Sequence, residues 1–485
     1  MRTKQILICF FMLISFQIFS IDFLPINYEY VFSEGSKFFH SFQRKYLDFY
    51  FENQANTFFF SVLIGLINKL TFSLIDQLLI ARLISLSSFI FLFLGILNTL
   101  KYFKIDKSLA LLIIIFVLSN PIFWKLSFRG TPDLISASLA FYASSIILTQ
   151  YDKAINRRAA FLLLGIAITM KPFVGIYLIY IFFFLIKNPK IIFNNKVFID
   201  LLYLAIIPCI YFYTIKNFFG FYIMTEHYVT KNIVGQGINI KMYLTKFFGY
   251  ACMLSIFLFP INLAARFKIN FKIILAYSFL LFFGVTKFNF FSSKNKGFEL
   301  DLGFFTTYMN QYVLLILCFT LLFITILSIA QKVDNKINYM NNFKIISTVL
   351  IFLLIMAALK PAQRYLITIL PIIIIFIIQN SDFKKIRILM IVGVFLYIPI
   401  NLVSYLNMYN NSNINKEILE YIENKKLTKI IKLDTLKHSL GFIEVNSNHE
   451  IEKEYVLSNK FQDHFKKFEK SFLGQKKIYY IKKNN

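Results

Sequence analysis

Long apolar runs divide this chain, and short polar loops separate them. Many of the runs are about 17–25 residues long, and a helix needs about 20 apolar residues to cross a hydrocarbon core of about 30 Å. The composition agrees, because 58% of the residues are hydrophobic and only 16% are charged. So few charged groups would not cover the surface of a soluble protein of this size. We therefore predict an all-α polytopic membrane protein.

The alternation of runs and loops predicts about 13 transmembrane helices. The first covers residues 6–21; a cleaved signal peptide is the alternative, but residues 18–20 match a cleavage site poorly. The shorter run Phe58–Leu70 predicts a helix that lies at the membrane interface or is partly inserted. The other spans are expected over residues 78–100, 108–124, 134–150, 158–170, 173–186, 197–215, 247–265, 272–290, 309–330, 345–360, 365–379 and 386–404.

The net charge of +27 comes from lysines and arginines in short clusters between the apolar runs. A nucleic-acid-binding protein would concentrate them on one face or in one domain, so nucleic acid is not an expected partner. Basic loops mark the cytoplasmic side of a membrane. The loops assigned to that side are 101–107, 152–158, 187–196, 266–272, 332–344 and 382–387. This topology predicts a bacterial-type inner or plasma membrane protein with a cytoplasmic N-terminus.

Two domains are expected from the same pattern. Residues 1–404 form the transmembrane domain, with an extracytoplasmic first loop over 22–56 that is rich in aromatic residues. An odd number of spans places residues 405–485 outside the cytoplasm. This tail is more polar and contains strand-like pieces at 429–432 and 478–481, which predict a small C-terminal α/β domain.

Carboxylates stand in the first extracytoplasmic loop, just beyond the first helix. Asp22, Glu29 and Glu34 lie there at the mouth of the membrane, where a carboxylate could act as a general base on an acceptor hydroxyl or amine. The alternative interpretation is that all three are ordinary solvated loop acids.

A second polar segment precedes the span at 134–150. It contains Trp124, Arg129 and Asp133, and Thr131 followed by Pro132 is a favourable start for a helix. Asp133 could therefore cap the helix or pair with Arg129. Charged residues beside membrane spans commonly mark function, which keeps a binding role open for Arg129 and Asp133.

Two further cations interrupt apolar sequence. Lys171 and Pro172 split a stretch too short for two full spans, which predicts two short helices that meet at Lys171 beside a recess; a snorkelling lysine is the alternative. Arg364 lies in a tight turn with Gln363 and Tyr365. Its planar guanidinium matches phosphate oxygens, although an interfacial anchor is the alternative.

These polar groups all fall on the extracytoplasmic side of the expected topology. Cations and carboxylates around one recess beside lipid suit a substrate with a phosphate on a lipid tail. The sequence contains no glycine-rich phosphate loop, no zinc motif and no nucleophilic Ser or Cys with a His partner. A divalent metal that bridges the phosphate stays an open question.

The order of five motifs resembles the GT-C superfamily of membrane glycosyltransferases, especially the branch of protein mannosyltransferases and aminoarabinose transferases. The motifs are the acidic loop Asn27–Gly35, Ala81-Arg82-Leu-Ile-Ser85, Pro121 to Asp133, Arg158 to Lys171, and Gln363-Arg364-Tyr365 to Pro371. The resemblance covers roughly residues 5–380 of the 485. It departs from the family at Tyr28-Glu29, where the family usually carries an aspartate.

The resemblance implies a glycosyltransferase that moves a sugar from a polyprenyl-phosphate-linked donor to a glycan, lipid or protein acceptor outside the cytoplasm. Glu29 would be the catalytic base, with Asp22 and Glu34 as alternatives. Lys171 and Arg364 would bind the donor phosphate. The cavity or the sugar would be bound by Arg129, Asp133, Gln363 and Tyr365.

Two other functions compete with this one. A flippase or transporter of lipid-linked saccharides would carry inverted repeats and charges at mid-membrane depth, which this sequence lacks. A polysaccharide polymerase or ligase would have a long outer loop with Arg and His, but the loop 216–246 contains His227 and no Arg.

Overall fold

The structure is a computed structural model of the whole chain. It describes residues 29–53, 57–105, 107–185, 195–219, 239–264, 271–291, 310–329, 336–359, 361–425, 430–432, 455–458, 466–472 and 475–483. The described part is predominantly helical. Five of its helices are long and apolar enough to cross a membrane, or six if a bent pair counts as one span. The fold is that of a helical integral membrane protein.

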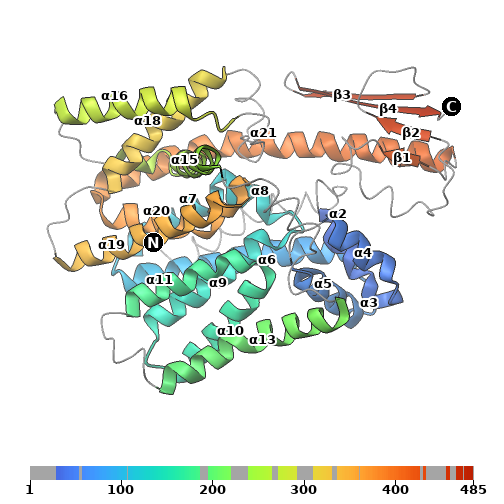
Figure 1. The fold of residues 1–485 in the computed structure, drawn as a ribbon, viewed down its shortest axis with the longest axis horizontal. Helices are drawn as coiled ribbons and strands as arrows, with labels where there is room; N and C mark the ends of the chain where they lie inside the picture. Colours follow the sequence, from blue (N-terminus) through green and yellow to red (C-terminus); the bar gives the residue numbers. More distant parts are fainter. Residues whose placement is uncertain are drawn as a thin grey trace.

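The helices follow one another with short connections (Figure 1). They are α2 (Glu29–Ser36), α3 (Phe38–Ser41), α4 (Arg44–Asn53), α5 (Phe59–Leu70), α6 (Gln77–Tyr102), α7 (Lys107–Ser119), α8 (Pro121–Ser127), α9 (Pro132–Thr149), α10 (Ala154–Met170), η1 (Pro172–Gly175), α11 (Ile176–Leu185), α13 (Asn195–Phe219), α15 (Ile240–Phe257), η3 (Ile261–Ala264), α16 (Phe271–Lys287), α18 (Gln311–Ile329), α19 (Lys336–Ala357), η5 (Gln363–Thr368), α20 (Leu370–Gln379) and α21 (Phe383–Asn424).

Each expected span after the first coincides with one of these helices or with a pair of them, and Phe58–Leu70 is helical as α5. The expected number of about 13 spans is not confirmed. The candidates by length and composition are α6, α9, α13, α18 and α21, and the bent pair α7 and α8 turns by 66°. The first expected span lies outside the described residues.

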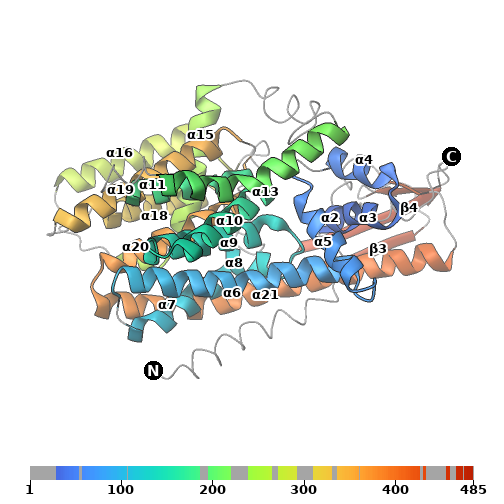
Figure 2. The ribbon, with the colours of Figure 1, turned by 90° about the horizontal axis from the view of Figure 1, so that it is seen from below.

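Close helix contacts build the centre of the bundle. Helix α9 packs against α6 on one side and α10 on the other, and α10 packs against α13 (Figures 1 and 2). Glycines permit this approach. A Cβ at Gly95 would lie 2.7 Å from the Phe141 ring, and a Cβ at Gly165 would lie 2.3 Å from the carbonyl oxygen of Leu204. The side chains between the helices form one continuous apolar core.

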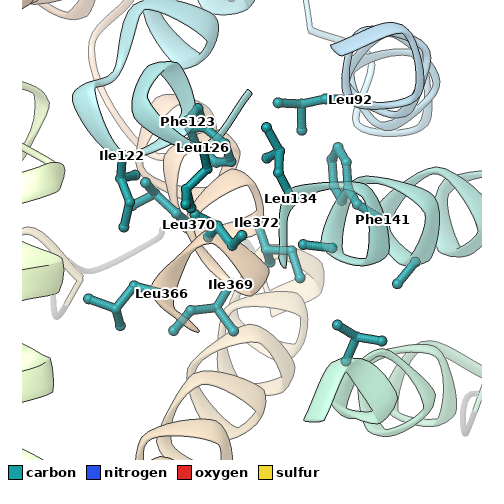
Figure 3. Packing of buried hydrophobic residues seen from close by; sticks show 14 of the residues in the cluster. Leu92, Ile122, Phe123, Leu126, Leu134, Phe141, Leu366, Ile369, Leu370 and Ile372 are labelled. Carbon is teal, nitrogen blue, oxygen red and sulfur yellow. The ribbon is translucent and has the colours of Figure 1, made fainter. Parts of the chain in front are cut away.

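An apolar layer joins the elements that carry the charged residues of the candidate site. Side chains of α6, α8, α9, η5 and α20 lie together in this layer (Figure 3). They are Leu92, Ile122, Phe123, Leu126, Leu134, Phe141, Leu366, Ile369, Leu370 and Ile372. Because these residues are buried, the end of α8, the start of α9 and the turn η5 are held at one end of the bundle.

The segment α2 to α5 forms a compact unit at the same end (Figure 1). Helix α2 packs against α4, α5 and α6. Edge-on aromatic contacts fill its interior: Phe32 meets Tyr50 at 5.9 Å and Phe60 at 5.4 Å between ring centroids. Such pairs add stability beyond the area that they bury.

The C-terminal strands β1 (Ile430–Lys432), β2 (Tyr455–Ser458), β3 (Lys466–Phe472) and β4 (Gln475–Lys483) form one sheet of order β1-β2-β4-β3. Strands β1 and β2 are parallel, and the other pairs are antiparallel. Phe468 of β3 packs edge-on against Tyr421 of α21 at 5.5 Å. Helix α21 runs through residue 404 without a break, so a domain over 405–485 stays a prediction.

Candidate active site

Asp133 and Lys171 form a buried ion pair at one end of the bundle. Asp133 stands in the first turn of α9, which begins at Pro132 as the sequence predicted. Lys171 follows the last residue of α10 and has an extended backbone before Pro172 and η1. Lys171 Nζ lies 2.9 Å from Asp133 Oδ1, and the side chains are only 1% and 3% exposed. The expected pair of short helices at Lys171 is present.

Arg364 is a partly exposed cation of this group. Its Nε lies 3.7 Å from Asp133 Oδ1, and its side chain is 35% exposed. The turn η5 that carries Arg364 is tied at both ends by buried tyrosines. The Ala362 N–H donates to Tyr250 Oη at 2.9 Å, and the Tyr177 hydroxyl donates to the Thr368 carbonyl at 2.5 Å. The backbone at Arg364 is therefore fixed while its side chain reaches outward.

Aromatic rings cover the two cations. Phe173 and Tyr365 lie 4.7 Å apart between centroids. Lys171 Nζ lies 5.6 Å from the Phe173 ring and 5.8 Å from the Tyr365 ring, and the Arg364 guanidinium lies 5.7 Å from Tyr365. Contacts of this kind stabilise a cation that has lost part of its hydration. The Tyr365 ring thus helps to stabilise the charges of Lys171 and Arg364.

Glu29 is held by two partners in a second buried pair. Arg82 Nη2 of α6 lies 2.8 Å from Glu29 Oε2, and both side chains are 2% exposed. The other oxygen, Oε1, accepts a hydrogen bond from the Gly130 N–H at 3.2 Å. Gly130 itself lies against α6, where a Cβ would come within 2.8 Å of Ala81 Cβ. Glu29 therefore connects α2, α6 and the segment before α9.

Arg129 stands between the two pairs. Burial lowers the pKa of its guanidinium, Glu29 and Asp133 raise that pKa, and Arg364 and Arg82 lower it. Arginine stays protonated at any physiological pH. Among the described residues the group thus contains the cations Arg82, Arg129, Lys171 and Arg364 and the carboxylates Glu29 and Asp133. Positive charge exceeds negative charge in a largely buried place, which favours an anionic ligand.

The structure brings together most of the residues that the sequence singled out. Arg129, Asp133, Lys171 and Arg364 meet, and Glu29 touches the group through Gly130. Of the two partners considered for Asp133 from the sequence, helix capping and Arg129, neither is the main one. Lys171 and Arg364 take that place because the ends of α9, α10 and η5 converge.

Glu34 and Asp22 are the two other carboxylates that the sequence offered as a base. Glu34 is buried on α2 and pairs at 2.7 Å with Lys37, the residue that precedes α3, rather than with a member of the charged group. Burial raises the pKa of its carboxyl, and Lys37 offsets part of that rise. Asp22 lies outside the described residues. Gln363 lies on η5 beside Arg364 and is half-buried.

The sequence did not reveal that Arg82 is the ion-pair partner of Glu29. The residue was visible as a charge inside the otherwise apolar run 78–100, and such charges by default mark function. Its pairing with Glu29 spans 53 residues and follows only from the packing of α2 on α6. Within the described residues, no group of three or more His, Cys, Asp and Glu is placed to hold a metal ion.

Comparisons with known proteins give a structural likeness. No family model and no curated protein matches the chain. ArnT from Cupriavidus metallidurans bound to undecaprenyl phosphate is similar with a TM-score of 0.46 and 12% identity, over 92% of this chain and 86% of that one. The apo state of the same protein is similar with a TM-score of 0.44 and 11% identity, over 91% of this chain and 84% of that one.

At identities this low, the likeness assigns no activity to the chain.

Proposed function

We propose that the protein is a membrane glycosyltransferase that takes a sugar from a polyprenyl-phosphate-linked donor and gives it to an acceptor on the extracytoplasmic face. The observation that carries the proposal is the buried group of Asp133, Lys171 and Arg364 with its excess of positive charge. It lies at one end of an apolar helical bundle. A lipid-borne phosphate supplies the charge that such a place favours and reaches it from the membrane.

The reaction is a single displacement at the anomeric carbon of the sugar. The bond from this carbon to the donor phosphate oxygen breaks, and a bond to the acceptor oxygen or nitrogen forms with inversion. The leaving phosphate gains negative charge as the bond breaks. Cations fixed in a water-poor site stabilise such developing charge strongly, which is commonly a large part of catalysis.

Arg364 is the cation proposed to touch the phosphate, because its side chain is 35% exposed while that of Lys171 is 1% exposed. Lys171 is proposed to act indirectly: its ion pair orients Asp133, and Asp133 in turn orients Arg364. This divides the two phosphate-binding residues expected from the sequence into an outer ligand and an inner support.

Glu29 is the proposed base that takes the proton of the acceptor. Its Oε1 accepts the Gly130 N–H at 3.2 Å and Arg82 orients the other oxygen, so the carboxylate is held in one place beside the charged group. Asp22 and Glu34 stay the alternatives. Arg129, Gln363 and Tyr365 are proposed to line the sugar.

The proposal is tested by transfer of label from the donor lipid. Membranes that contain the protein are supplied with polyprenyl monophosphates that carry a radiolabelled hexose or pentose. We expect label to move from the donor into another lipid, a glycan or a protein. Arg364→Ala should reduce the transfer rate about a hundred-fold or more, the usual effect of losing one such charge-stabilising group.

The matched control is Arg387→Ala, which removes an exposed arginine near the start of α21. It should transfer at the wild-type rate. The thermal midpoint of both variants is measured in the same detergent, so that unfolding is separated from loss of chemistry. Label that crosses the membrane still attached to polyprenyl phosphate would mean transport, and equal rates for Arg364→Ala and wild type would refute the proposed site.

A further inference from the structure

The short segment before α5 contacts the end of α10 through one buried hydroxyl. Thr57 Oγ1 donates to the carbonyl oxygens of Thr169 and Met170, the latter at 3.1 Å. Thr57 is 1% exposed and Thr169 is fully buried. The two residues are 112 positions apart in the sequence. The hydroxyl has one proton, which it shares between the last two carbonyls of the helix.

Those carbonyls need an external donor. The last four carbonyls of an α-helix have no N–H partner in the following turn. Pro172 adds to this shortage at the end of α10, because proline has no N–H to offer to the turn before it. A buried carbonyl without a partner would cost free energy. Thr57 therefore does more than fill space: it fixes where the last turn of α10 ends.

Thr57 is itself held from both sides. The Tyr50 hydroxyl of α4 donates to the Thr57 carbonyl at 2.7 Å, and the Phe58 N–H donates to Tyr211 Oη of α13 at 2.6 Å. Burial raises the pKa of Tyr50 well above its usual value, with a smaller contribution from Tyr211. The Tyr50 hydroxyl thus keeps its proton and donates at any physiological pH. These contacts tie the Thr57 backbone to two further helices.

The residue after Met170 is Lys171, whose ammonium group lies 2.9 Å from Asp133 Oδ1. A shift of the last turn of α10 moves the Lys171 backbone with it. Misplacement of a catalytic group by about 1 Å can cost about a hundred-fold in rate. We infer that Thr57 is a positioning residue that sets the place of Lys171 relative to Asp133. The inference rests on the proposed function of this group.

The test compares three variants of the full-length protein in lipid nanodiscs. Thr57→Val keeps the shape and removes the hydroxyl, and Thr57→Ser keeps the hydroxyl. Thr99→Val is the matched control: Thr99 is also buried and donates to a helical carbonyl, that of Gly95 at 2.7 Å, near the other end of α6. Two readouts are taken, hydrogen exchange of peptides over 165–175 and transfer kinetics with the labelled polyprenyl-phosphate sugar.

For Thr57→Val we expect hydrogen exchange over 165–175 to become several-fold faster. We also expect a fall in kcat of about ten-fold with KM within two-fold of wild type, because Lys171, through Asp133, orients Arg364 for the charge that develops on the leaving phosphate and does not itself bind the donor. Thr57→Ser should restore both values, and Thr99→Val should change neither. A Thr57→Val protein with wild-type exchange over 165–175, or with wild-type kcat, would overturn the inference.

The outcomes separate this inference from the proposed function. A wild-type protein that transfers no label would refute the proposed function. The exchange measurement would then decide whether Thr57 fixes the Lys171 end of α10, because it needs no substrate. Faster exchange in Thr57→Val alone would support that role, and unchanged exchange would overturn it.

Discussion

At the scale of single residues, the two buried ion pairs of the candidate site are sensitive to the loss of either partner. Each charge lost its water on folding, and its partner compensates for that loss only if the geometry is good. Glu29 and Arg82 meet this condition, because they are 2.8 Å apart and Glu29 also accepts the Gly130 N–H. Removing one partner of such a pair costs about 3–5 kcal/mol, since the other charge stays buried.

This argument separates two roles of Glu29. The variant Glu29→Gln should lower the thermal midpoint strongly, because Arg82 then lacks its counter-charge. The double variant Glu29→Gln with Arg82→Gln should recover most of that midpoint, since neither member of this pair is then charged. If Glu29 is the base, label transfer by the folded double variant stays about a hundred-fold or more below wild type.

The midpoint is followed by intrinsic fluorescence in detergent, and transfer by the labelled-donor assay. Asp48→Asn serves as a control for loss of a carboxylate, because Asp48 is exposed and pairs with Arg44 at the surface. Recovery of transfer in the double variant would show that Glu29 is an anchor for the Arg129–Gly130 segment and not the base.

At the scale of elements, α10 places Lys171 and depends on α13 for its own position. Arg157 of α10 pairs with Asp200 of α13 in a buried contact, and Gly165 lets the two helices approach until the Leu204 carbonyl lies beside it. The contact is made of backbone atoms, which cannot swing aside as a flexible side chain can. The separation of α10 and α13 is therefore sensitive to a single methyl group.

We expect Gly165→Ala to lower the free energy of unfolding by about 1–3 kcal/mol, the usual cost of overpacking a tight contact. The added Cβ would lie 2.3 Å from the Leu204 oxygen, so the helices must separate. Gly175→Ala is the matched control, because a Cβ there meets nothing within 4 Å. The prediction fails if both variants unfold at the same denaturant concentration.

At the scale of the whole molecule, the orientation in the membrane decides what the charged group can meet. The end that carries Asp133, Lys171 and Arg364 is opposite to the basic loop between α9 and α10, because α9 starts at the former and ends at the latter. Positive loops favour the cytoplasm, so the charged group is expected to face outward.

Cysteine labelling in intact cells tests this orientation. In a variant without the four native cysteines, Leu74→Cys places a thiol between α5 and α6, and Lys153→Cys places one between α9 and α10; both positions are exposed. A membrane-impermeant maleimide should label only Leu74→Cys, and both should react after the membrane is permeabilised. Labelling of Lys153→Cys alone in intact cells would reverse the topology.

The sequence by itself determined the local structure. Helices form where apolar runs were found, and α9 begins at Pro132. Helix α10 ends just before Lys171 and Pro172. These features depend on neighbouring residues alone: proline removes a donor, and an apolar run hides its backbone groups in a helix. The residue types near the site were also visible, because charges are rare in such a chain.

Only the tertiary structure decided which charges pair. From the sequence, Asp133 had Arg129 or its own helix as partners, and Glu29 had none; in the fold they meet Lys171 with Arg364, and Arg82. The contact from Thr57 to Thr169 was equally hidden. The physical reason is that a helix apolar on all sides does not specify which face meets which neighbour. Pairing over such distances in sequence follows from how the helices pack, and the packing results from close contacts such as Gly165 on Leu204.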